Sequence, residues 1–298
     1  MIARSNNPRL APYALLAPFA VVFFLFTAYP LVQSLVLSMQ QTFGPAASRW
    51  VGLRNYEYLL RDPLFWKALR NTCVYAAGSM FIQLPLALGL ALLLERPGVK
   101  GKGVWRLVLF SPSLVGVAFA AMIFGVILEK RTGLLNLALH ALTAGLPTPW
   151  NIDFPWLQQQ VMWALIVASL WMFVGFNMTY FSAALQNVRQ ELLEAATLDG
   201  ASAWQRFRHV VVPEILPVGG FVVLLSLIGS FQLFELPYLM LTGAGPDNRG
   251  LTIVLYLYQT GFDSGDLGYA SAIGWVLASI LAGATILQRR LVSRGEVQ

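Results

Sequence analysis

The chain has 298 residues, of which 57% are hydrophobic and only 11% are charged, and its formal net charge is +6. A soluble domain usually has about 25% charged residues, so this chain has too little charge to cover a surface that faces water, and the same composition excludes a disordered chain. A single cysteine excludes a disulfide framework or a thiolate metal cluster within the chain. The composition therefore indicates a protein that crosses a membrane several times.

Six stretches of the chain are long and apolar enough to cross a bilayer, which takes about 20 mostly apolar residues in a helix. The sequence therefore predicts an all-α, polytopic membrane protein with six transmembrane helices. Arg4 and Arg9 before the first stretch resemble the start of a signal peptide. That stretch is longer than a signal peptide requires, and we expect it to remain as a helix. The six stretches are Tyr13–Leu37, Thr72–Leu94, Leu107–Leu128, Met162–Leu185, Gly219–Leu241 and Tyr269–Leu287.

The positions of lysine and arginine predict the orientation, because connections that face the cytoplasm are enriched in these residues. Twelve of the 20 basic residues lie in the N-terminal segment, the second and fourth connections and the C-terminal tail. The remaining eight lie in the first, third and fifth connections. Both termini are therefore expected in the cytoplasm, and the net positive charge reflects membrane topology rather than a nucleic-acid partner.

The chain has no motif for hydrolysing ATP or for enzyme catalysis. The nearest approach to a phosphate-binding G-x-x-x-x-G-K-[ST] loop is Gly101-Lys102-Gly103, where Gly103 replaces Ser/Thr and Arg96 replaces the first glycine. His140 and His209 make no metal-ligand spacing, and no nucleophile has a matching base. We therefore predict a protein that is not an enzyme, has no metal site, and takes energy from a partner or an ion gradient.

Glu235 is the only ionisable residue within the six apolar stretches. It lies in the fifth stretch, roughly 9 Å from the expected outer end at the rise of an α-helix. Charged groups inside a membrane are costly and are usually functional. Two interpretations stay open: Glu235 faces a water-filled path, or it reaches the outer interface or a neighbouring helix.

The fourth connection, Gln186 to Pro217, has a pattern of its own. Glu191 to Leu198 is predicted as a short helix, which Gly200 ends in the left-handed conformation. Ser202 and Gln205 have the spacing of a capping box that starts a second helix, which Pro213 and Pro217 are expected to end. Periodicity alone allows two interpretations: a rigid acidic knob that docks into a cleft on another protein, or an amphipathic linker on the lipid headgroups.

The residues of this connection resemble a known pattern. Glu194-Ala195-Ala196, Gly200 and Val210-x-Val212-Pro213 are similar to E-A-A-x3-G-x9-I-x-L-P, the EAA loop of ABC-transporter permease subunits. Other stretches are similar to the sugar-importer branch of that family, so the resemblance covers nearly the whole chain. These stretches are G-L-R-N-Y at residues 52–56, N-T at 71–72, G-L-L-N at 133–136, Y-x-x-A-A-L-Q-N-V at 180–188, D-G-A-S-A-W at 199–204 and L-T-G-A-G-P at 241–246.

The resemblance implies a type I ABC importer permease of the maltose/glycerol-3-phosphate type, the first permease of its pair. Such a subunit lies in the cell membrane and forms a carbohydrate path with a second permease. It receives sugar from an extracytoplasmic binding protein and docks on two cytoplasmic ATPase subunits, which hold ATP and Mg²⁺, so no cofactor belongs to this chain. The residues implied to couple to the ATPase are Glu191, Glu194, Ala195, Ala196, Asp199, Gly200, Phe207 and Pro213.

The resemblance also implies an organisation along the chain. Residues 1–68 are expected to hold the N-terminal cytoplasmic segment, the first transmembrane helix and an outer loop. Residues 69–290 are expected to form the permease transmembrane domain of five helices, with the coupling loop at about 186–217, and residues 291–298 a cytoplasmic tail.

The fourth and fifth stretches offer candidate residues for a sugar path near the membrane midplane. Sugars need planar hydrogen-bonding groups and aromatic faces, and both occur here at spacings of three or four residues. Ordinary helix packing is the alternative for each of them, and a self-contained secondary transporter or channel for a small polar solute is the alternative function. The candidates are Trp171, Phe173, Phe176, Asn177, Ser230, Phe231, Gln232 and Glu235.

Overall fold

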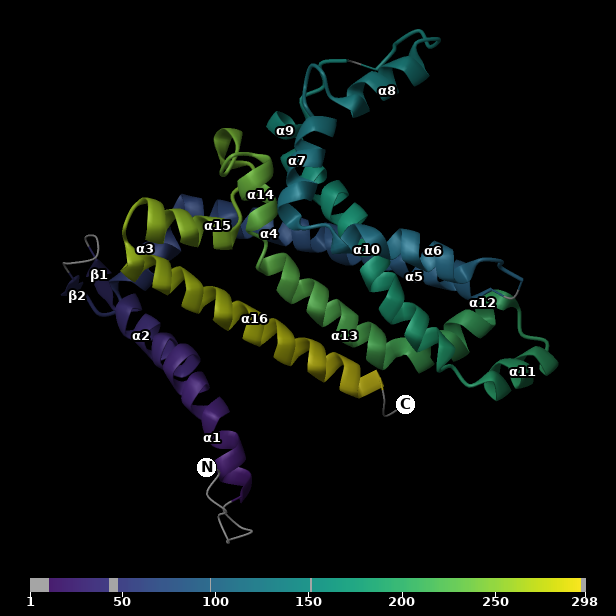
Figure 1. The fold of residues 1–298 in the computed structure, drawn as a ribbon, viewed down its shortest axis with the longest axis horizontal. Coiled ribbons are helices and arrows are strands. Elements are labelled where there is room, and N and C mark those ends of the chain that lie inside the picture. The colour runs from purple at the N-terminus through teal and green to yellow at the C-terminus, as the bar shows by residue number, and fades with distance from the viewer. Residues whose placement is uncertain (1–10, 43–47, 97, 151, 296–298) are drawn as a thin grey trace, which may run out of the picture. The chain divides into compact units, whose positions relative to one another are not determined.

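A computed structural model describes residues 11–42, 48–96, 98–150 and 152–295. The fold is all-α apart from one ribbon of two three-residue strands, β1 (Gln40–Thr42) and β2 (Ser48–Trp50). Contacts divide the chain into two compact units, residues 1–62 with 257–276 and residues 63–256 with 277–298. Figure 1 follows the chain from its purple N-terminal helices to the long yellow helix α16 (Leu267–Gly295).

Among the described residues, five helices are long and apolar enough to cross a membrane, and a sharply bent helix pair supplies a sixth span if it counts as one. This agrees with the predicted polytopic, all-α class. The five long helices are Leu15–Ser38, Pro63–Glu95, Val161–Gln186, Ala203–Phe231 and Leu267–Arg290, and the bent pair is Lys102–Leu114 with Val117–Ile127.

The first unit contains the first membrane helix, the strand ribbon and the start of α16. The first membrane helix consists of α1 (Ala11–Phe23), a π-helical turn and α2 (Tyr29–Ser38). Asn55, in α3 (Arg54–Arg61), donates hydrogen bonds from Nδ2 to the backbone oxygens of Ser38 (2.9 Å) and Gln40 (2.8 Å). A buried asparagine thus closes the end of α2, which explains the asparagine of the G-L-R-N-Y stretch.

The start of α16 packs against the same unit without a side chain between the backbones. A Cβ atom on Gly268 would lie 1.9 Å from the carbonyl oxygen of Gln40, so only glycine fits there. At the next residue, the Tyr269 hydroxyl donates to the buried Asp62 carboxylate at 2.6 Å. This contact satisfies a carboxylate that burial would otherwise penalise.

The second unit is built around α10 (Val161–Gln186). It packs most extensively against α5 (Leu84–Glu95), which continues α4 (Pro63–Gly78) through a π-helical turn, and also against α6 (Lys102–Phe110). A Cβ atom on Gly175 would lie 1.8 Å from the backbone oxygen of Leu109, so α6 lies directly against the α10 backbone. Close contacts of this kind through small residues are typical of helix packing inside membranes.

The remaining elements of the second unit are short helices in the connections, α13 and the later part of α16. Figure 1 shows α13 in the green part of the chain, and it packs against α10. The bounds are η3 (Ser111–Leu114), α7 (Val117–Ile127), α8 (Leu134–Thr143), α9 (Trp156–Gln159), α11 (Gln190–Leu198), α12 (Ala203–Arg206), α13 (Val212–Phe231), α14 (Glu235–Met240), η5 (Pro246–Asn248) and α15 (Ile253–Tyr258).

Asn136 organises the segment between α7 and α10. The side chain is fully buried, and its Nδ2 donates to the backbone oxygens of Lys130 (3.1 Å) and Phe154 (2.9 Å). Its Oδ1 accepts from the indole N–H groups of Trp150 (3.2 Å) and Trp156 (2.9 Å). All of these hydrogen bonds converge on one amide, which explains the asparagine that ends the G-L-L-N stretch.

Two predicted spans differ from the structure. The third, Leu107–Leu128, is bent by 94° around η3 and the residues after it. The fifth, Gly219–Leu241, ends as a helix at Phe231 and resumes as the separate helix α14, which begins at Glu235. The prediction that Glu235 lies within a continuous fifth span is therefore wrong. Apolar composition does not predict a break of this kind. Backbone that leaves the helix is tolerated at membrane depth where it lines a cavity, so an apolar stretch can hold a continuous helix or a broken one.

The prediction that Pro213 and Pro217 end the second helix of the fourth connection is also wrong, because the helix runs unbroken from Ala203 to Phe231. A π-helical turn, Phe207–Val211, ends two residues before Pro213. Proline has no N–H and its ring clashes with the carbonyl four residues earlier, and a wider turn relieves that clash.

A π-helical turn also precedes a proline in each of the first two membrane helices. The π-helical turns Phe24–Ala28 and Ser79–Gln83 end two residues before Pro30 and Pro85. Of the four π-helical turns among the described residues, only Gln259–Asp263 has no such proline. Pro30, Pro85 and Pro213 therefore each follow a widened turn and do not end the helix.

Candidate functional site

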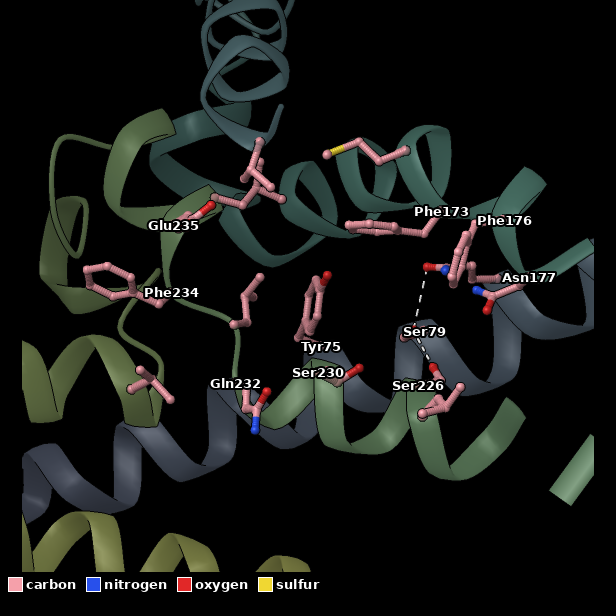
Figure 2. Close-up of a pocket in the computed structure, with 18 residues that line it drawn as sticks. Tyr75, Ser79, Phe173, Phe176, Asn177, Ser226, Ser230, Gln232, Phe234 and Glu235 are labelled. Carbon is pink, nitrogen blue, oxygen red and sulfur yellow. Dashed lines mark hydrogen bonds between the residues drawn. The ribbon is translucent and has the colours of Figure 1, made fainter. Parts of the chain in front are cut away.

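A cavity of about 670 Å³ opens inside the second unit, where α13 gives way to α14. Figure 2 shows side chains from several helices around it, with Phe173, Phe176 and Asn177 on α10 across from Ser226, Ser230 and Gln232. The full lining is Tyr75, Ser79, Gln83, Val117, Met172, Phe173, Phe176, Asn177, Leu225, Ser226, Gly229, Ser230, Gln232, Leu233, Phe234, Glu235, Leu236 and Val254.

The break between α13 and α14 supplies the polar end of the cavity. Gln232 caps the C-terminus of α13, and Phe234, the residue before α14, has the non-helical angles φ −137° and ψ −59°. The side chains of Gln232 and Glu235 are both exposed, and both line the cavity. Broken helices place exposed backbone and polar side chains at solute sites in other membrane transport proteins.

Hydroxyl and amide groups line the opposite wall. Ser79 Oγ lies 2.9 Å from Ser226 Oγ and 3.5 Å from Gln83 Oε1, so the π-helical turn after α4 is linked to α13. Tyr75 is largely buried beside Ser79, and Asn177 is largely buried across the cavity on α10. The cavity thus combines hydroxyl, amide and carboxylate groups with the aromatic rings of α10, an arrangement that can bind a neutral polar solute with C–H faces.

Six of the eight predicted path residues line this cavity: Phe173, Phe176, Asn177, Ser230, Gln232 and Glu235. Trp171 and Phe231 do not. The Trp171 ring packs edge-on against Phe124, with ring centroids 5.6 Å apart. Phe231 is 7% exposed and belongs to the packed core.

Sequence reasoning missed the part of the cavity lining that comes from the second membrane helix. It also missed a serine on α13 and a phenylalanine in the break before α14. Ser79 and Gln83 stand four residues apart in an otherwise apolar stretch, and that polar pair was the available signal. Helical spacing places Ser226 four residues before Ser230, on the same face of α13. The missed polar and aromatic lining residues are Tyr75, Ser79, Gln83, Ser226 and Phe234.

The fourth connection forms a knob of two helices, α11 and α12, joined by Gly200. The glycine has φ of +78°, and Ala201 and Gly200 donate backbone hydrogen bonds to Ala196 (3.0 Å) and Thr197 (3.1 Å). These are the two hydrogen bonds of a Schellman motif, so α11 ends in the left-handed conformation that the sequence predicts.

The capping box at the start of α12 is present as predicted. The backbone N–H of Ser202 donates to Gln205 Oε1 (2.7 Å), and the N–H of Gln205 donates to Ser202 Oγ (3.3 Å). Arg206 then reaches back to α11 and donates to Thr197 Oγ1 at 3.0 Å. Reciprocal capping and this cross-link hold the two short helices in one arrangement.

The outer surface of the knob is exposed. Glu191, Glu194, Ala195 and Asp199 are exposed on α11 and its C-cap, and Ala196 is half-buried beside a hollow of about 300 Å³. Pro213 is exposed in the first turn of α13, and Phe207 is half-buried, with its ring centroid 5.5 Å from that of the exposed Trp204. The structure therefore leaves acidic and apolar side chains of the knob without cover from the described part of the chain.

Ion pairs attach the knob and its flanking helices to the unit. Arg189, just before α11, donates to Glu214 on α13 at 2.7 Å, and this hydrogen bond raises the pKa of the guanidinium. On the neighbouring helices, Glu95 accepts from Arg106 and from Gln186 at the end of α10.

Within the described residues, no group of three or more His, Cys, Asp or Glu side chains has the spacing to hold a metal ion.

Comparison with known proteins decides the family. The family model described as "Binding-protein-dependent transport system inner membrane component" matches residues 87–296. The chain belongs to this family. As a member of the binding-protein-dependent transport family, it is a multi-pass membrane subunit.

Curated relatives of this binding-protein-dependent permease are similar over nearly their whole length. The arabinooligosaccharides transport system permease protein AraP of Halalkalibacterium halodurans is 37% identical over 284 residues, which cover 95% of this chain and 88% of the relative. The sn-glycerol-3-phosphate transport system permease protein UgpA of Yersinia pseudotuberculosis is 31% identical over 287 residues, which cover 95% and 94%.

A solved structure shares the fold. A chain of a bacterial alginate ABC transporter, crystallised in complex with an alginate pentasaccharide-bound periplasmic protein, superposes with a TM-score of 0.80. The alignment covers 95% of this chain and 94% of that one at 21% sequence identity. The bent and broken helices of the permease described above therefore belong to a known ABC-importer fold.

Proposed function

We propose that the chain is a transmembrane permease subunit of an ATP-driven carbohydrate importer. The observation that carries this proposal is the cavity at the broken fifth helix, in a chain whose family serves binding-protein-dependent transport. In this role the chain forms a sugar path together with a second permease subunit, and the cell membrane holds the pair with both termini in the cytoplasm.

The lining chemistry supports a saccharide as the solute. Hydroxyl and amide groups such as Ser79, Asn177 and Gln232 can exchange hydrogen bonds with sugar hydroxyls, and the rings of Phe173 and Phe176 can cover C–H faces. The names of the relatives include arabinooligosaccharides and sn-glycerol-3-phosphate, so the family alone leaves the charge of the solute open.

The knob supports a second part of the proposal, coupling to ATPase subunits. Its acidic side chains Glu191 and Glu194 are exposed, and its fold is fixed by the Gly200 turn and the capping box. A rigid, exposed helix end with exposed carboxylates suits a cleft that has basic residues. In this proposal the small side chains of Ala195 and Ala196 permit close approach of the ATPase to α11. Phe207 and Pro213 support the knob where it continues into α13.

The partners follow from the same proposal. Two cytoplasmic ATPase subunits bind ATP and Mg²⁺ and supply the energy, and an extracytoplasmic binding protein delivers the sugar. A self-contained secondary transporter is less well supported, because proton or ion coupling usually relies on several buried carboxylates or histidines, whereas this cavity has one carboxylate among its described lining residues.

Reversing one charge on the knob tests the coupling. We expect Glu194→Lys to abolish sugar-stimulated ATP hydrolysis in the assembled complex while the subunit still inserts and assembles with the second permease. Glu57→Lys changes another exposed carboxylate, on α3, and is the control for the change in net charge. Normal stimulation in the Glu194 variant would refute coupling through the knob.

A further inference from the structure

We infer that Glu235 is a charge filter that makes the path selective for neutral saccharides over anionic ones. The inference rests on the proposed function, a saccharide path through this cavity, and adds the charge class of the solute and the residue that selects it. It depends on the formal charges around the cavity, on the exposure of the Glu235 carboxylate and on the absence of a nearby described cation.

The only formal charge among the described lining residues of the cavity is negative. Its described lining contains one carboxylate, Glu235, and no lysine, arginine or histidine. The remaining polar groups are hydroxyls and amides, which can donate to a uronate or a phosphate but carry no compensating charge. An anionic solute in this cavity would therefore meet a net negative wall.

The Glu235 carboxylate is available to act on a solute. The side chain is exposed, it points into the cavity in Figure 2, and no ion pair or hydrogen bond to its carboxylate is formed by the part of the chain that the structure describes. The three ion pairs found among the described residues all lie outside the cavity lining. A charge that no described neighbour neutralises acts on whatever occupies the cavity, reduced only by the surrounding solvent and salt.

The expected size of the effect follows from Coulomb's law. Two negative charges about 6 Å apart in surroundings with an effective dielectric constant of about 20 to 40 repel each other enough to weaken binding by about tenfold to a hundredfold. A neutral sugar of the same size escapes this penalty, and its hydroxyls can donate to the carboxylate in a charge-assisted hydrogen bond.

Equilibrium binding to the assembled permease–ATPase complex in lipid nanodiscs, without the binding protein, tests the inference. The probes are neutral di- and trisaccharides of hexoses and the same sugars with one hydroxymethyl group oxidised to a carboxylate. Their ratio of dissociation constants, anionic over neutral, isolates the charge preference of the path. We expect a ratio of about 10 to 100 for the wild type, a ratio near one for Glu235→Gln and an inverted ratio for Glu235→Lys.

Two controls separate this effect from others. Glu57→Gln removes a carboxylate outside the cavity and should keep the wild-type ratio. In the wild type, the ratio should fall as salt is raised, because ions screen the repulsion, and this measurement requires no variant to fold.

The outcomes are distinguishable. A wild-type ratio near one, or a high ratio that persists in Glu235→Gln and is insensitive to salt, overturns the filter while leaving the saccharide path intact. If the wild type binds none of the neutral or anionic probes, the proposed saccharide path itself is wrong and the filter is wrong with it.

Discussion

Replacing Gly200 tests whether the shape of the knob matters for docking on the ATPase. The residue has φ of +78°, and a Cβ atom built on it would meet no atom within 4 Å, so alanine fits sterically and only the backbone conformation is penalised. The left-handed conformation costs an L-residue about 1–2 kcal/mol. If the docked knob requires this conformation, the affinity of the permease for the ATPase falls by about 5- to 30-fold in Gly200→Ala.

Side chains of different shape make this prediction sharper. Asparagine tolerates the left-handed region better than alanine, and the β-branched valine tolerates it worse. We therefore expect the affinity to decrease in the order Gly, Asn, Ala, Val at position 200, as measured by titrating the ATPase onto the permease pair in nanodiscs and following sugar-stimulated ATP hydrolysis. Equal affinity for Gly and Val, or an order that follows side-chain volume instead of backbone preference, would refute the argument.

The structure makes further predictions. In the proposed path, Asn177→Ala and Gln232→Ala should each lower sugar uptake by the assembled complex without lowering its yield, and wild-type uptake in both would assign these residues to packing. Asn136→Leu removes a buried amide with four hydrogen bonds and should cost about 3–4 kcal/mol locally, seen as faster hydrogen exchange at the indole N–H groups that bond to it. Gly175→Ala should lower the thermal stability of the subunit, because its Cβ would overlap the α6 backbone, whereas Gly89→Ala in α5 meets no atom within 4 Å and should not.

The fold was predictable to the extent that composition and local motifs decide it. Apolar length predicted the number of spans, and the Gly200 turn and the Ser202 capping box followed from residues that act on their immediate neighbours. The helix that continues through Pro213 was not predictable from the proline alone, because the π-helical turn that accommodates it has no sequence signal of its own. The break after Phe231 was missed for a related reason, since Gln232 and Glu235 stand among apolar residues and no glycine or proline marks the point where the helix stops.

The cavity was predictable in part. Asn177, Gln232 and Glu235 were identifiable because polar residues are rare in apolar stretches and are costly there without a partner or water. Trp171 was misassigned because an aromatic ring in a membrane helix fits a packed core and a solute path equally well. Ser79 was missed because its partner, Ser226, lies 147 residues away, and only the packing of α13 against the second membrane helix brings the pair together.

Reconstitution into liposomes tests the central claim most directly. The chain is reconstituted alone and together with a second permease, the ATPase pair and a binding protein. Uptake of a radiolabelled saccharide is then measured with and without ATP on the side of the membrane that holds the ATPase subunits. The account predicts uptake only in the complete assembly and only with ATP. Uptake driven by a sugar, proton or sodium gradient through the chain alone would contradict it.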